Sequence, residues 1–419
     1  MTSASASSDA RQWIGRIDEL IAESDLLNDR DGLPMVGGAN LMSRSVHHAM
    51  ASNIGLRPRV RSLDERLRGP RHAADEIEII AKDLLGRLFK ARFAEVRVLS
   101  GSLANLQVYL ALAQPGDSIL ALPRTNGGHA SHGAEGAAGL RGLVCSSIPC
   151  HAGTYLIDHD QLADDIARQR PQLVIVGSSV PLVNYDLRRL ARTVHEAGAK
   201  LIYDAAHVAG LIAGGRFQDP LSEGADAVTL STYKTLNGPA GGAILTNDPE
   251  IAERLDRISW PGLTANFDMA RVAGLAVACA ELLEFGAEYA DDCMRNAVEL
   301  ASRLEEHEVL VWSPDGGRSV TSSHMLAIDA AKWPSAQDAV RLAHSCNVFA
   351  SSIPLPERPK GGVRLGLHQL TRLGMRTPDM GELAQLISTA FRQESEPDAV
   401  RRQVARFRSD FQRIGYSFD

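Results

Sequence analysis

Short apolar runs alternate with helical patterns between about residues 95 and 245. The runs cover 96–100, 118–122, 173–179, 200–207, 226–232 and 241–246, and helical patterns cover 102–113 and 186–199. Such alternation predicts an α/β fold with a mostly parallel sheet covered by helices on both faces. Ligands of these sheets bind at the carboxyl ends of the strands, so the polar residues that end each run are candidates for a site.

After Pro261 the pattern becomes mainly helical. It predicts helices at 269–285 and 287–305, strands within 310–312, 324–330 and 363–367, a helix at 335–347, and two closing helices between 379 and 414. We therefore expect three parts: an N-terminal segment (1–60), a large domain (61–285) and a small C-terminal domain (286–419).

Composition narrows the class of protein. The chain has 419 residues, of which 44% are hydrophobic, and we find no run of about 18 apolar residues that a membrane span would need. The opening MTSASASSDARQW has neither a basic leader nor an apolar run, so we expect a cytoplasmic protein. Five scattered cysteines without paired spacing predict no metal site.

Net charge argues against a nucleic-acid-binding protein, because the chain carries −7 at pH 7. One local exception is a run of arginines: Arg57, Arg59, Arg61, Arg66, Arg68 and Arg71. This run is either a solvated basic face, a set of salt bridges, or a seat for an anionic ligand.

Three strand ends carry side chains that suit ligand binding or catalysis. At Ser100-Gly101-Ser102 a strand meets a helix on small residues, which suits an anion, although serine is also an ordinary helix N-cap. Asp204 ends a strand apolar enough to be central, where a buried carboxylate needs a cationic partner. The protonated pyridine of pyridoxal 5′-phosphate (PLP) is such a partner; the alternative is an Asp that caps the next helix.

Lys234 ends another apolar strand and precedes a turn. Burial lowers the pKa of a lysine and frees the neutral amine that forms an imine, whereas a surface lysine in a loop is the alternative. The candidate anion-binding turn at Ser100-Gly101-Ser102, Asp204 and Lys234 occur together in this order, so a PLP site is favoured over the separate alternatives.

On these residues the chain resembles the serine hydroxymethyltransferases, a branch of the fold-type I (aspartate aminotransferase-like) PLP enzymes. The motifs that carry the resemblance are SGSLAN, GGHASHG, DAAHVAGLIAGG, STYKTLNGPAGGAIL and, in the small domain, GVRLG. The resemblance implies a fold-type I enzyme whose larger domain, 61–285, binds PLP.

The resemblance also implies roles for individual residues. Lys234 would form the imine with PLP, Asp204 would hold the pyridine nitrogen, and His129 would stack on the ring. For the base that takes the proton of a substrate β-hydroxyl, our own candidates are His129 and a bound water. The phosphate would lie by Ser100, Gly101, Ser102 and Tyr233, while Ser179 and His207 would line the cofactor. Arg364 would take the substrate carboxylate. His132 would be a second base on the substrate side, or else a loop histidine bonded to the backbone.

The resemblance breaks where that family binds folate. In place of a Ser-Glu-Asn motif with a catalytic glutamate, this chain has Gly37-Gly38-Ala39-Asn40. No tyrosine precedes Tyr109, where the family has a tyrosine-rich segment, and GLTANFD replaces a glycine-rich loop after Pro261. These losses, beside intact PLP residues, indicate carbon–carbon bond chemistry without tetrahydrofolate.

We therefore expect an enzyme that cleaves or forms the Cα–Cβ bond of a β-hydroxy-α-amino acid by retro-aldol or aldol chemistry. The leading hypothesis is a threonine aldolase or transaldolase, resembling those of natural-product pathways, which would pass a glycine quinonoid to an aldehyde acceptor. The arginine run raises the hypothesis that this acceptor is anionic. The alternatives are a serine or α-methylserine hydroxymethyltransferase and a non-catalytic PLP-binding regulator. Resemblance also implies a homodimer or a pair of dimers.

Overall fold

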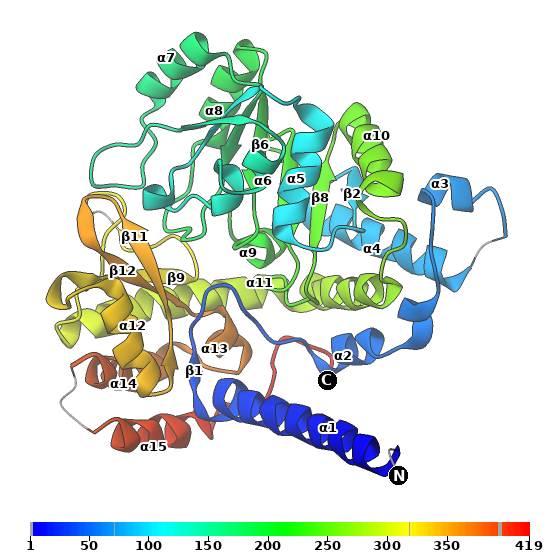
Figure 1. Ribbon diagram of the computed structural model, residues 1–419. Helices are drawn as coiled ribbons and strands as arrows, with labels where there is room; N and C mark the ends of the chain where they lie inside the picture. Colours follow the sequence, from blue (N-terminus) through cyan, green and yellow to red (C-terminus); the bar gives the residue numbers. More distant parts are fainter. Residues whose placement is uncertain (1–2, 71, 318, 393–395) are drawn as a thin grey trace.

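The computed structural model describes residues 3–70, 72–317, 319–392 and 396–419. It has a large α/β lobe and a smaller lobe, and one long helix, α11 (Met269–Glu306), runs along both (Figure 1).

The large lobe contains a seven-stranded sheet in the order β2-β8-β7-β6-β5-β3-β4. The strands are β2 (Phe93–Glu95), β3 (Ser118–Ala121), β4 (Val144–Ser147), β5 (Leu173–Val176), β6 (Lys200–Asp204), β7 (Ala227–Ser231) and β8 (Gly242–Thr246). Strands β3 to β7 run parallel to one another, and β8 is antiparallel to both of its neighbours. The predicted fold class, a mostly parallel sheet of fold-type I, is confirmed.

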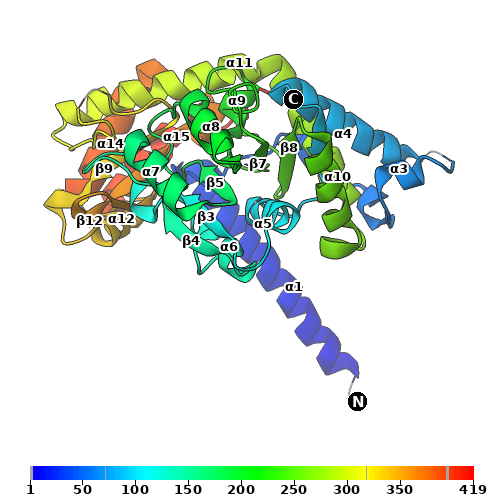
Figure 2. The same ribbon diagram turned by 90° about the horizontal axis from the view of Figure 1, so that it is seen from above.

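The sheet separates two hydrophobic cores, because side chains alternate between its faces. On one face Leu120, Val174 and Leu201 pack under α4 (Ala73–Phe89), α8 (Leu187–Glu196), α9 (Ala209–Ala213) and α11. On the other face Ile119 and Ile175 pack under α5 (Gly101–Leu112), α6 (Ala137–Leu140) and α10 (Pro249–Arg257). Figure 2 shows the two helical layers on either side of the strands.

Two strand predictions were wrong, those at 96–100 and 310–312; in the second, Val311 forms only an isolated bridge with Ile328. The segment 96–100 is no strand, because the Glu95 carboxylate accepts the backbone N–H of Arg97 (2.8 Å), which a continuing strand would offer to its neighbour. The sequence also missed β4, whose residues Val-Cys-Ser-Ser are partly exposed at the sheet edge and give no apolar run.

The small lobe is built on a three-stranded antiparallel sheet in the order β11-β12-β9. Its strands are β9 (Met325–Asp329), β11 (Ser351–Leu355) and β12 (Arg358–Gly366). A core formed with α12 (Ala336–Ser345), α13 (His368–Arg372), α14 (Met380–Arg392) and α15 (Pro397–Arg408) fills this lobe. The N-terminal part adds β1 (Leu33–Pro34), which pairs in parallel with β10 (Val348–Phe349).

The two helices predicted at 269–285 and 287–305 are one helix, so that prediction was wrong. Gly286, which we took for the break, lies inside α11 against Gly214 at the end of α9. A side chain on Gly214 would place its Cβ 2.3 Å from the Gly286 carbonyl oxygen, so close packing of the two helices explains these glycines. We keep the predicted division of the chain as a proposal, noting that residue 285 lies within α11.

At the N-terminus α1 (Ser3–Asp25) projects from the body as an arm, followed by η1 (Leu26–Asp31). The remaining helices are α2 (Arg44–Met50), α3 (Leu63–Arg66) and α7 (His159–Gln169), and the short helices η3 (Arg124–Asn126) and η4 (Ala130–His132) lie near the sheet. No helix in the described ranges combines the length and apolar character that crossing a membrane requires.

We predict that Gly214→Ala lowers the free energy of unfolding by about 1–3 kcal/mol, because the new methyl group forces α9 and α11 apart. Denaturant unfolding followed by circular dichroism would measure it. Gly381→Ala in α14 is the matched control: its Cβ meets no atom within 4 Å, so stability should rise slightly. Equal stability of the Gly214 variant and the wild type would contradict the packing argument.

Candidate active site

A cavity that is partly open to solvent lies where β5, β6 and β7 end and α5 begins. All nine residues predicted to bind the cofactor line it: Ser100, Gly101, Ser102, His129, Ser179, Asp204, His207, Tyr233 and Lys234. The sequence did not assign roles to Asn105, Gly177, Ser178, Ala206 and Ser231, which also line it. Asn105 carried a signal, since it and Gln107 are the two amides in a mostly apolar helix.

Lys234 is buried, and its Nζ lies 3.0 Å from His207 Nε2. The other ring nitrogen of His207, Nδ1, lies 3.0 Å from the carbonyl oxygen of Gly37. A carbonyl only accepts, so Nδ1 carries the proton and Nε2 is the acceptor for the lysine. Burial lowers the pKa of Lys234 to about 8, which makes the neutral, imine-forming amine accessible near neutral pH.

Asp204, at the end of β6, is surrounded by hydrogen-bond donors. Its Oδ2 accepts from Asn105 Nδ2 (2.9 Å) and His132 Nε2 (3.1 Å), and its Oδ1 accepts from the Ala206 N–H (2.9 Å). Burial alone would raise the pKa of Asp204, but these bonds hold it well below the ordinary value. The site therefore contains a permanent buried carboxylate that can face a cation.

His129 is held by the same network. Asn105 Nδ2 also donates to Ser131 Oγ (3.0 Å), and Ser131 approaches His129 Nδ1 with its backbone N–H (3.1 Å) and its hydroxyl (2.8 Å). Because Nδ1 accepts these bonds, the neutral ring carries its proton on Nε2. His129 therefore presents a donor, and burial lowers its pKa.

The opposite end of the cavity suits an anion. Ser100 caps α5 by accepting from the Leu103 N–H (3.2 Å), and Gly101 and Ser102 form the first turn. A Cβ on Gly101 would lie 2.4 Å from Ser231 Oγ, so only glycine lets the helix start this close to the end of β7. The positive end of the helix dipole and the nearby hydroxyl groups favour a phosphate here.

Arg364 comes from β12 of the small lobe and reaches the same region. Its Nη1 donates to the Ser179 carbonyl (2.7 Å), while its buried Nε has no hydrogen-bond partner within the described parts of the chain. No carboxylate among the described residues forms an ion pair with it, and burial lowers its pKa. A buried guanidinium without an anion is suited to a substrate carboxylate.

The structure does not place His132 where the sequence predicted. Its ring is buried outside the cavity lining, between Asp204 and Tyr109, whose hydroxyl lies 2.5 Å from His132 Nδ1. The expectation of a substrate-side base, or of a ring bonded to the backbone, is therefore corrected: both ring nitrogens contact side chains.

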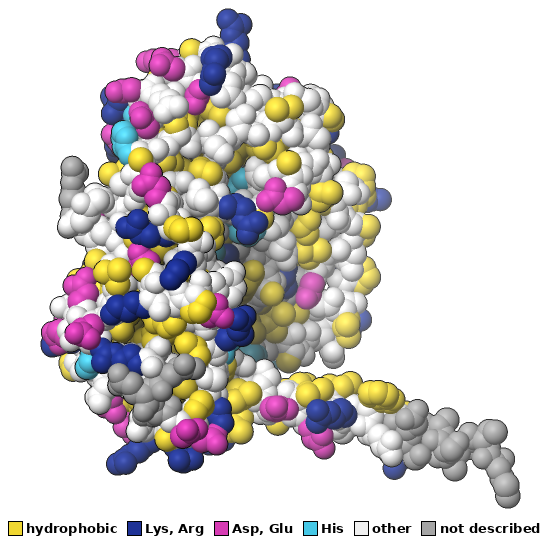
Figure 3. All heavy atoms as spheres, turned by 60° about the vertical axis from the view of Figure 1, so that its left-hand side comes forward, with side chains coloured by type: hydrophobic (Ala, Val, Ile, Leu, Met, Phe, Trp, Pro, Cys, Tyr) yellow, Lys and Arg dark blue, Asp and Glu magenta, His cyan; other side chains and the backbone are white. Residues whose placement is uncertain are grey.

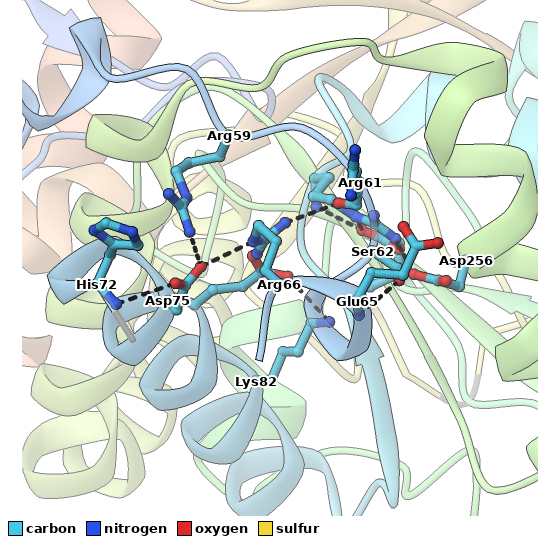
Figure 4. A network of polar contacts seen from close by, with 12 residues as sticks. Arg59, Arg61, Ser62, Glu65, Arg66, His72, Asp75, Lys82 and Asp256 are labelled. Atoms are coloured by element: carbon cyan, nitrogen blue, oxygen red, sulfur yellow. Dashed lines mark hydrogen bonds and ion pairs between the residues drawn. The ribbon is translucent and has the colours of Figure 1, made fainter. Parts of the chain in front are cut away.

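Two arginines of the run, Arg59 and Arg66, form internal ion pairs. Arg59 and Arg66 both donate to Asp75, and Arg66 also pairs with Glu78 (Figure 4). Both carboxylates are fully buried on α4, so these arginines fix the 57–66 stretch to that helix. Arg57, Arg61 and Arg68 remain exposed, and Arg71 lies outside the described residues.

Comparison with known proteins agrees with this geometry. The family model "Serine hydroxymethyltransferase" matches residues 16–387. An α-methylserine aldolase from Ralstonia sp is 36% identical over 94% of this chain and 91% of its own length. A serine hydroxymethyltransferase from Korarchaeum cryptofilum is 38% identical over 97% of each chain.

Among solved structures, an L-threonine transaldolase from Pseudomonas fluorescens in its internal aldimine state superposes with a TM-score of 0.90. It is 26% identical, and the match covers 99% of this chain and 96% of the other. These likenesses identify PLP as the cofactor. The residues present fit it: a buried amine of lowered pKa, a buried carboxylate and a helix N-terminus lie around one cavity.

We predict that Lys234→Ala abolishes the visible absorption of the imine that PLP forms with the protein and lowers turnover by at least about a thousandfold. Absorbance spectra of the purified protein with added PLP would measure the first effect. Lys200→Ala is the control, since Lys200 pairs with Asp226 at the far end of β6. A visible band that persists in the Lys234 variant would rule out the assignment.

Proposed function

Because the chain belongs to the serine hydroxymethyltransferase family, we propose that it cleaves and forms the Cα–Cβ bond of a β-hydroxy-α-amino acid without tetrahydrofolate. The observation that carries the proposal is the segment Gly37-Gly38-Ala39, which passes the site without an acidic side chain. Depending on the register of the resemblance, Ala39 or a glycine stands where the family has its catalytic glutamate, and a Cβ on Gly38 would meet no atom within 4 Å. Of the described residues that line the cavity, Asp204 is the only carboxylate.

PLP bound here withdraws electrons from the substrate Cα, so that the bond to Cβ can break. The substrate carboxylate would lie against Arg364, whose free Nε and anchored Nη1 fix its direction. Asp204 would hold the proton of the pyridine nitrogen by its negative charge. These residues serve the donor half of the reaction whatever the acceptor is.

The proton of the β-hydroxyl needs an acceptor within the cavity. The sequence assigned this role to His129, but its hydrogen bonds place a proton on Nε2 and leave no lone pair directed at the substrate. We assign it instead to Lys234 together with His207, because burial lowers the pKa of the lysine amine to about 8 and His207 Nε2, 3.0 Å from Nζ, could accept a proton from it. His129 would then donate a hydrogen bond from Nε2 or stack on the PLP ring.

Two donor amino acids remain as candidates. Threonine is supported by the likeness of the whole chain to the threonine transaldolase, and α-methylserine by the likeness to several α-methylserine aldolases at 36–38% identity. The first would leave glycine for a second aldehyde, and the second would leave alanine and formaldehyde. Among the described arginines of the run, Arg57, Arg61 and Arg68 are exposed and could bind an anionic acceptor. Family membership and the transaldolase likeness make this an enzyme, which removes the non-catalytic regulator.

We predict that the PLP-loaded enzyme releases acetaldehyde from L-threonine or formaldehyde from α-methylserine, at a rate that tetrahydrofolate changes by less than about twofold. An aldehyde-coupled assay with each amino acid, with and without tetrahydrofolate, measures this directly, and adding a second aldehyde then separates aldolase from transaldolase. Turnover of serine that requires tetrahydrofolate, with neither aldehyde formed in its absence, would favour the hydroxymethyltransferase.

The homodimer implied by the resemblance is also a proposal, supported by α1. Along one side of this arm lie Trp13, Ile14, Ile17, Leu20 and Ile21, each about half exposed or more (Figure 3). In proteins most of a helix's stability comes from packing its apolar face against another surface rather than from helix propensity. A second copy of the chain offers such a surface.

We predict that the wild type sediments at about twice its monomer mass of 45.1 kDa. Replacing Ile14, Ile17 and Ile21 by serine should raise the dissociation constant at least about tenfold, because this removes apolar area from the interface. Gln12→Ser with Glu19→Ser, on the opposite side of the helix, is the control. Analytical ultracentrifugation over a concentration series decides, and a monomeric wild type would contradict the proposal.

A further inference from the structure

Two buried side chains outside the cavity connect to Asp204 by a line of hydrogen bonds. Tyr109, on α5, is 1% exposed, and His132, at the end of η4, is 3% exposed. The Tyr109 hydroxyl lies 2.5 Å from His132 Nδ1, and His132 Nε2 lies 3.1 Å from Asp204 Oδ2. Among the described residues His132 is the hydroxyl's hydrogen-bond partner, so the tyrosine has no other polar role visible in the fold.

The donor and acceptor of each hydrogen bond between Tyr109, His132 and Asp204 follow from the charge of Asp204. Asp204 is a carboxylate and can only accept, so His132 Nε2 carries a proton. A neutral imidazole then has its lone pair on Nδ1, and the Tyr109 hydroxyl donates to it. Burial raises the pKa of Tyr109 well above its ordinary value, so the hydroxyl keeps its proton. The opposite tautomer would set the Nε2 lone pair against the negative carboxylate.

Asp204 and a pyridine nitrogen compete for one proton. Donors to the carboxylate stabilise its charged form and leave the proton on the ring, whereas loss of a donor moves it toward Asp204. A ring with a neutral nitrogen is a weaker electron acceptor. Asp204 Oδ2 accepts two hydrogen bonds, one donated by His132 and the other by Asn105.

We propose that Tyr109 and His132 are positioning residues that, by fixing the histidine tautomer, keep the proton on the pyridine nitrogen of PLP rather than on Asp204. The inference rests on the proposed function in one respect, that PLP binds with its ring nitrogen at Asp204. Neither residue touches substrate or cofactor, so both act through the carboxylate.

The test uses holoenzyme loaded with PLP that is ¹⁵N-labelled at the ring nitrogen, whose NMR chemical shift reports protonation. In Tyr109→Phe the shift should move toward the unprotonated value, corresponding to about a tenfold change in the proton equilibrium, the size of one pKa unit. His132→Leu, which removes the donor to Asp204, should move it further. His132→Gln places an amide N–H near the position of Nε2 and should restore the wild-type shift.

Kinetics provides a second readout. In Tyr109→Phe we expect kcat to fall about tenfold while the amino acid KM changes by less than about twofold, because Arg364 is untouched. Tyr185→Phe is the matched control: it also removes a buried hydroxyl, but one that bonds neither Asp204 nor its donors Asn105 and His132, so its variant should keep the wild-type ¹⁵N shift.

A wild-type ¹⁵N shift in both Tyr109→Phe and His132→Leu would overturn the inference and leave the proposed function standing. If the wild-type ring nitrogen is itself unprotonated, or if PLP does not bind at Lys234, the placement of PLP against Asp204 fails instead. A shift that moves equally in Tyr185→Phe would also overturn the inference, because any lost hydroxyl would then have the same effect.

Discussion

The hydrogen bond from His207 to the carbonyl oxygen of Gly37 is the constraint on which the site depends. It fixes the histidine tautomer, and so the side of Lys234 from which a proton can be taken. The same N-terminal segment is held at two further points: the Ala39 carbonyl accepts from His368 Nε2 (2.7 Å), and Asn40 donates to the Lys234 carbonyl (3.0 Å). The segment 37–40 thus contacts the Lys234 carbonyl directly and the Lys234 Nζ through His207.

The absence of side chains in that segment is part of the same arrangement. A Cβ on Gly37 would lie 2.7 Å from the Met325 methyl group and 3.1 Å from Arg364 Nε. Any other residue here would therefore press on the Arg364 side chain. The small residues of this segment therefore have two effects. They bring no acidic side chain to the site, and they leave space for the Arg364 side chain.

Sequence reasoning worked best where a chemical group ends an apolar strand. Asp204 and Lys234 were found in this way, since strand burial and a charged end are both local signals. His132 could not be placed, because its partners Tyr109 and Asp204 lie 23 and 72 positions away and meet it only in the fold. The roles of Arg59 and Arg66 depend on buried carboxylates of α4, which a charge run alone does not reveal. Strand β4 was missed because an edge strand needs no apolar run.

The single long helix α11 has a consequence for how the molecule comes apart. Its 38 residues span about 57 Å at 1.5 Å per residue, and its buried side belongs to the core of the large lobe at one end and to that of the small lobe at the other. Melting either core would remove the packing from one end of the helix. The two lobes therefore form one cooperative unit, and excising either as a stable fragment would require cutting through a helix that both of them share.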